Sequence, residues 1–170
     1  KANREEEAGN LFKAFLLYLE DASEYMKRGS LARAALSCSC AGNCMANQGY
    51  LYEASQLYRQ TAMLYEENAD SVIGESVRES LWLLREAYQH FLLASARDGA
   101  ERAFNKYISL AKRISPFVEE ESMLPLPSIE KEVEAAKITK SLPNRQIPEI
   151  AKAIEGFLLS IERASGSTNT

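Results

Sequence analysis

The sequence predicts an all-α fold in which antiparallel helix pairs stack as a short, repeat-like solenoid, followed by a C-terminal helical hairpin. Apolar residues recur every three or four positions along most of the chain, which is the period of a helix buried on one face. A glycine followed five residues later by an alanine occurs twice, at Gly29 and Ala34 and at Gly49 and Ala54. Glycine suits the turn between two helices, and a small residue lets two helices cross closely.

Five helices are expected in residues 1–115, which form the repeat-like body. Four of them are expected at about Glu5–Lys27, Leu31–Asn47, Tyr50–Asn68 and Glu75–Arg97. Asp98 and Glu101 have the spacing of a capping box, so a fifth helix follows them and ends near Ile114. Ser30 and Ser71 are the candidate N-caps of the helices that follow the first and third turns.

The amino-acid composition changes after residue 115. Residues 116–127 contain three prolines and form the expected linker, because proline disfavours helix at the preceding residue. Residues 128–164 are expected to form a C-terminal two-helix unit, with Ser128 capping the first helix and Pro148 in the first turn of the second. The last helix has a strong apolar stripe, which either folds back on the body or pairs with a second copy of the chain. Residues 165–170 are expected to be disordered.

Composition excludes several classes of function. Of the 170 residues, 46% are hydrophobic and 26% are charged, as in an ordinary globular domain. The formal net charge of −4 argues against nucleic-acid binding, which favours a basic surface. The longest apolar run, from Ala14 to Leu19, is far too short to span a membrane.

The three cysteines, Cys38, Cys40 and Cys44, are too close together to join distant segments and are expected to be reduced thiols of a cytoplasmic protein. Cys38 lies about 200° from Cys40 around a helix, so the three thiols do not converge on one metal. Cysteine also packs well as a small apolar residue. We therefore expect buried thiols, with no metal and no cofactor, and keep a metal or redox role as the alternative.

The spacing of Ala22, Tyr25, Gly29, Ala34 and Ala41 resembles a tetratricopeptide repeat. The segment from Glu53 to Tyr65 resembles the repeats of soluble vesicle-fusion attachment proteins. The segment from Tyr18 to Tyr50 also resembles the end of a small archaeal helical domain family of unknown function.

The tetratricopeptide resemblance implies a non-enzymatic scaffold that binds a protein or peptide in a concave helical groove, with self-association through the C-terminal helices as a further expectation. It also implies that Lys27, Asn43 and Asn47 lie near that groove. Tyr52 is the expected surface aromatic of the third helix and is a further candidate contact.

An enzymatic alternative rests on Arg85 and His90, which fit the Arg-x4-His pattern of a class of all-helical ribonucleases. In that reading the arginine holds the scissile phosphate and the histidine acts on the ribose hydroxyl. The two residues lie about 140° apart on an ideal helix, and the chain has only this one histidine. A solvent-exposed helix pair is the simpler interpretation, so we rank the scaffold first.

Overall fold

The computed structural model describes residues 1–115 and 147–166, and every described secondary-structure element is an α-helix. The helices of the body are α1 (Ala2–Glu7), α2 (Leu11–Lys27), α3 (Leu31–Asn47), α4 (Leu51–Val72), α5 (Val77–Leu93) and α6 (Arg97–Ile114). The last helix is α8 (Ile147–Gly166). The predicted all-α class is therefore confirmed. The linker 116–127, the helix expected after Ser128 and residues 167–170 of the expected tail 165–170 lie outside the described residues, whereas Ser165 and Gly166 belong to α8.

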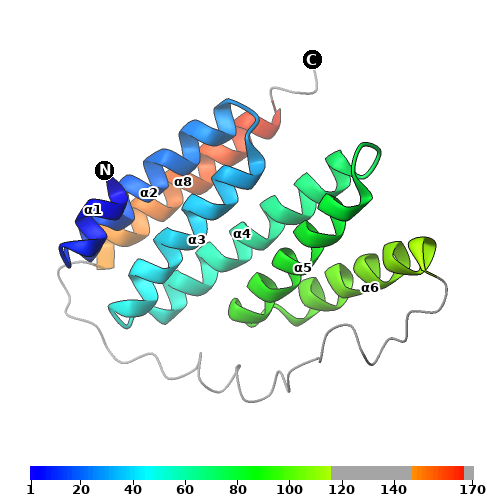
Figure 1. The fold of residues 1–170 in the computed structure, drawn as a ribbon. Coiled ribbons are helices and arrows are strands. Elements are labelled where there is room, and N and C mark those ends of the chain that lie inside the picture. Colours follow the sequence, from blue (N-terminus) through cyan, green and yellow to red (C-terminus); the bar gives the residue numbers. More distant parts are fainter. Residues whose placement is uncertain (116–146, 167–170) are drawn as a thin grey trace.

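Each helix of the body packs most extensively on the helices before and after it in sequence (Figure 1). Side chains also join helices that are two apart. Ser39 of α3 bonds His90 of α5, and Glu66 of α4 pairs with Arg102 of α6. The odd-numbered helices α3 and α5 therefore meet on one side of the array, and α4 and α6 meet on another. This sequential packing is compatible with a helical repeat.

One turn geometry recurs between the helices. At Gly9, Gly29 and Gly49 the backbone φ is positive. The amide of the glycine and that of the next residue bond back to carbonyls of the helix that is ending, as from Gly29 N to Met26 O (2.9 Å) and from Ser30 N to Tyr25 O (2.8 Å). This is the Schellman ending, which needs a left-handed residue. Ser95 takes the same role after α5, with φ of 53°. The predicted turn residues at Gly29 and Gly49 are confirmed.

Several predicted boundaries are wrong. The first predicted helix, Glu5–Lys27, is two helices, because Gly9 adopts a left-handed conformation that ends α1. The third extends to Val72, so Ser71 lies inside it and donates a hydrogen bond to the Asn68 carbonyl instead of capping the next helix.

The start of α5 and the start of α6 also differ from the prediction. Ser76 caps α5, its hydroxyl accepting from the Glu79 amide at 3.2 Å. Because Ser95 ends α5 early, α6 already begins at Arg97. Asp98 and Glu101 therefore lie inside α6 and not at its N-cap, and no side chain caps this helix.

Small residues allow the helices to approach closely. The buried side chains of α3 include Ala34, Ala35 and Ala41. A Cβ placed on Gly42 of α3 would lie 2.8 Å from the ring of Tyr58, and one on Gly99 of α6 would lie 2.4 Å from the ring of Phe91. In both places an aromatic ring fills the space that a glycine leaves open. Trp82, by contrast, is half exposed and meets Tyr65 edge to face.

Helix α8 folds back on the body and lies along α2, with further contacts to α4 (Figure 1). Its stripe of Ile150, Ile154 and Phe157 is buried in the same apolar cluster as Phe15 of α2. Ser23 and Ser160 also lie within hydrogen-bond distance at 3.3 Å. The sequence allows the last helix either to fold back on the body or to pair with a second copy of the chain. In the structure α8 folds back on the body.

We expect Gly99→Ala to lower the free energy of unfolding by about 1–2 kcal/mol. The new methyl group overlaps the Phe91 ring, and this cost exceeds the gain of about 1 kcal/mol from the better helix former. Gly156→Ala is the matched control, because Gly156 also lies within a helix but has no atom within 4 Å of the added Cβ. Urea unfolding followed by circular dichroism measures both. A Gly99 variant as stable as the Gly156 variant would contradict the close contact.

We expect Phe157→Ala to lower the free energy of unfolding by about 3–4 kcal/mol, because Phe157 is buried between α8 and the body. Leu159→Ala, two residues further along α8, should cost less than about 1 kcal/mol, since Leu159 is 46% exposed. The same urea titration tests both. Equal effects would mean that α8 does not pack on α2.

Candidate functional site

One stripe of α4 faces two different neighbours. The stripe follows helical spacing and consists of Tyr52, Gln56, Arg59, Met63, Glu66, Asp70 and Ile73. Its first residues, Tyr52 and Gln56, line a hollow with Leu158 and Leu159 of α8. From Arg59 onward the stripe turns to α6. Helix α8 therefore occupies the beginning of this face of α4, and the remainder borders α6.

Two hollows lie between α4 and α6, with volumes of about 670 Å³ and about 620 Å³. They share Asp98 and Arg102 as lining residues, so they adjoin each other, and together we call them the α4–α6 groove. Its lining comes from three parts of the chain: from α4 and the residue after it Arg59, Met63, Asp70 and Ile73; from α5 and the turn after it Ser80, Leu84, Phe91, Ser95 and Ala96; and from α6 Arg97, Asp98, Gly99, Glu101, Arg102, Asn105, Lys106, Ser109, Leu110 and Arg113.

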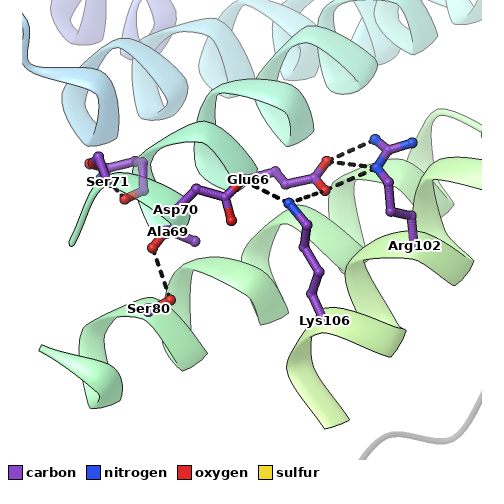
Figure 2. A network of polar contacts seen from close by, with 8 residues as sticks. Glu66, Ala69, Asp70, Ser71, Ser80, Arg102 and Lys106 are labelled. Atoms are coloured by element: carbon purple, nitrogen blue, oxygen red, sulfur yellow. Dashed lines mark hydrogen bonds and ion pairs between the residues drawn. The ribbon is translucent and has the colours of Figure 1, made fainter. Parts of the chain in front are cut away.

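Glu66 is the centre of a charged network in the groove (Figure 2). Its side chain is 8% exposed. Arg102 donates to both carboxylate oxygens, from Nε to Oε1 at 2.9 Å and from Nη2 to Oε2 at 2.7 Å. Lys106 Nζ lies 3.0 Å from Glu66 Oε1 and 2.7 Å from Asp70 Oδ2. A charge that is costly to bury is thus satisfied by two cations.

The network also shows how α4 and α6 are oriented relative to each other. Glu66 faces Arg102 and Asp70 faces Lys106, each 36 residues further along the chain. Moving four residues along α4 therefore moves four residues along α6, so the two helices run parallel here. The guanidinium of Arg102 also lies over the ring of Phe91, 5.3 Å from its centre.

The surroundings of the network shift its acid–base equilibria. Burial acts to raise the pKa of Glu66, but the hydrogen bonds from Arg102 and Lys106 outweigh it and bring the pKa below the ordinary 4.5. Burial acts to lower the pKa of Lys106, yet its contacts with Asp70 and Glu66 raise it above 10.5. Glu66 and Lys106 are therefore both charged near neutral pH.

The structure does not bring the four predicted contact residues together. Lys27 is exposed at the end of α2 and pairs with Glu24 at 3.0 Å. Asn47 is exposed at the far end of the antiparallel α3, and Asn43 accepts a hydrogen bond from the Tyr58 hydroxyl at 2.7 Å. Tyr52 is 60% exposed beside α8. None of them lines the α4–α6 groove, so their role as partner contacts stays a prediction.

His90 has a structural environment. It is buried, and its Nδ1 lies 2.8 Å from the Glu86 carbonyl, which accepts only. Nδ1 therefore carries the hydrogen, and Nε2 accepts from the Ser39 hydroxyl at 2.9 Å. Arg85 is exposed on the next turn back. The expectation that both residues are exposed is wrong for His90, whose Nε2 joins α5 to Ser39 of α3.

The cysteine thiols are mostly enclosed. Cys38 and Cys44 are buried and Cys40 is half-buried. Burial raises the pKa of Cys38 and that of Cys44 to about 12, and the Cys38 thiol donates to the Leu57 carbonyl at 3.4 Å. The reactive thiolate form is therefore disfavoured at neutral pH. Within residues 1–115 and 147–166, no three side chains of the metal-binding kinds gather at one point.

Sequence reasoning missed Glu66, Arg102 and Lys106. The available signal was a pair of matching spacings: Glu66 and Asp70 are four apart, and so are Arg102 and Lys106. Acids and bases at equal spacing on two helices can pair in register, but only if those helices are neighbours.

No match to a known protein supports the assignment of the fold, which is therefore made from its geometry alone. A scan of protein-family models, a search of curated proteins and a search of solved structures each found no match. Membership of the tetratricopeptide or attachment-protein families stays a prediction. None of the described helices has the length and apolar character that crossing a membrane requires.

We expect Glu66→Gln to lower the free energy of unfolding by about 1–3 kcal/mol at pH 7, because it leaves two cations without their shared carboxylate. The native pKa of Glu66 is depressed, so its contribution is complete above about pH 4.5 and is lost as the pH falls through the native value. The difference between wild type and variant should therefore shrink in acid.

Glu67→Gln is the matched control for this experiment, since Glu67 is the exposed neighbour on the same helix. Urea titrations between pH 3 and pH 8 measure the effect. If the two variants lose stability equally, or if the Glu66 difference does not depend on pH, the network contributes nothing to folding.

Proposed function

We propose that this protein is a non-enzymatic scaffold that binds a peptide segment of a partner protein in the α4–α6 groove. The observation that carries the proposal is a hollowed, solvent-facing surface between two parallel helices that the buried Glu66 network joins. A groove between helices is a common way to bind a peptide, because alternating apolar and polar groups can read its side chains.

Exposed apolar groups on this surface support the proposal. Met63 is 47% exposed and Ile73 is 38% exposed, and both line the groove from α4. Apolar side chains that face water inside a depression gain free energy when a partner covers them, at about 25 cal/mol per Å².

The neighbouring helix pair offers a precedent within the same molecule. Helix α8 covers the beginning of the same stripe of α4, beside Tyr52 and Gln56. This face of the array therefore binds a further segment of the chain, α8, next to α2 and α4. The α4–α6 groove has no such segment among the described residues.

No observation favours RNA cleavage by Arg85 and His90. Both ring nitrogens of His90 are engaged within the protein, and the residue is buried. A base for the ribose hydroxyl needs a nitrogen within reach of the substrate.

Selection of a phage-displayed random dodecapeptide library on the full chain tests the proposal. We expect the selected peptides to bind Met63→Glu at least tenfold more weakly than wild type, because a charge replaces an apolar contact. Leu36→Glu is the matched control, since Leu36 is 58% exposed on α3 and lies outside the groove. Fluorescence anisotropy gives the affinities. Peptides that bind both variants equally, or no selected peptides at all, would contradict this function.

A further inference from the structure

The two halves of the α4 face differ in chemistry, and this difference points to the kind of segment that each half accepts. The half beside α8 is covered by an apolar helix that buries Ile154 and Phe157. The half beside α6 is lined by charged side chains, among them Arg102, Lys106 and Arg113. A second apolar helix would bury these charged groups at a high cost. The occupant of the α4–α6 groove is therefore a polar or charged segment.

The charges that line the groove are unevenly paired. Lys106 pairs with Asp70 and Glu66, Arg102 pairs with Glu66, and Arg97 pairs with Glu101. In the described part of the chain, Arg59 and Arg113 line the groove without any ion-pair partner. Asp98 also lines the groove outside any ion pair, so among the described residues two arginines and one carboxylate of the groove are unpaired.

These two arginines lie at opposite ends of the groove. The parallel register that joins Glu66 to Arg102 places Arg59 level with the start of α6, whereas Arg113 lies in the last turn of α6. At 1.5 Å per residue the two positions are roughly 25 Å apart along the helix axis. An extended chain of about eight residues spans this length. Met63 and Ile73 lie between them.

We propose that the partner segment is an extended acidic peptide of about eight residues, with a carboxylate for Arg59 at one end, a carboxylate for Arg113 at the other, and apolar side chains between them on Met63 and Ile73. This inference rests on the proposed function. Arginine suits this role because its planar guanidinium binds a carboxylate through two hydrogen bonds.

A nucleic-acid strand fits this groove less well. Asp70, Asp98 and Glu101 also line it, and each would repel a phosphate chain that runs along the groove. Asp98 shares a hollow with Arg59, so a peptide with carboxylates only at its two ends meets fewer of these groups than a continuous phosphate chain does.

The test uses three fluorescein-labelled ten-residue peptides with blocked termini and the same alternating leucine and serine centre. Their two residues at each end are aspartate, glutamine or lysine. We expect wild type to bind the aspartate peptide at least tenfold more tightly than the other two, with an affinity that falls at higher salt. Arg59→Glu with Arg113→Glu should weaken this binding about twentyfold, or roughly fivefold for each lost pair, and should favour the lysine peptide.

The double variant Arg4→Glu with Arg33→Glu controls for the same change of charge on α1 and α3, away from the groove, and should bind like wild type. If the glutamine or lysine peptide binds wild type as well as the aspartate peptide, and Met63→Glu abolishes that binding, the acidic partner is overturned but the proposed function stands. If no peptide binds in a way that Met63→Glu weakens, both are overturned. Tighter binding of a ten-nucleotide uridine strand than of the aspartate peptide also overturns the inference.

Discussion

The close approach of neighbouring helices is the constraint on which the rest of this structure depends. Helix axes come within 8–10 Å only where the side chains between them are small or interlock. In α3 this is achieved by a run of buried alanines and by Gly42, against which the ring of Tyr58 packs. Gly99 and Phe91 repeat the arrangement between α5 and α6. Each helix packs on its sequence neighbours in this way. Helices that are two apart in sequence therefore contact each other only through side chains that do not take part in this packing.

Those second-neighbour contacts are where the polar chemistry of the molecule is found. Ser39 and His90 join α3 to α5, and Glu66 with Arg102 and Lys106 joins α4 to α6. Apolar packing between α4 and α6 would close the space between them, whereas long charged side chains hold the helices in register and leave a depression above the ion pairs. The groove is therefore a consequence of joining α6 to α4 by charge and to α5 by apolar contact.

Periodicity predicted the existence of the helices well, because each buried stripe recurs at helical spacing and each break contains a residue suited to a turn. The wrong predictions had two causes: the backbone conformation of single residues, and contacts between residues far apart in the sequence. Gly9 interrupts a stripe that continues on both sides, and Ser95 adopts a left-handed conformation that serine rarely takes, so both ends were misplaced. The groove was not predicted at all, since pairing Glu66 with Arg102 requires knowing which helices lie side by side 36 residues apart. The predicted contacts Lys27 and Asn47 were drawn from a family pattern and lie at opposite ends of α2 and α3.

The groove separates the residues that hold the fold from those that are available for a partner. Glu66 is buried and its loss affects the packing of α4 on α6, so it cannot report on binding alone. Arg59, Met63 and Arg113 are exposed and contribute little to the core, so a change at any of them acts chiefly on whatever occupies the groove. The ion pairs between α4 and α6 can hold the two helices in place while these exposed residues vary. In the scaffold that we propose, specificity can therefore change through Arg59, Met63 and Arg113 without loss of the helical array.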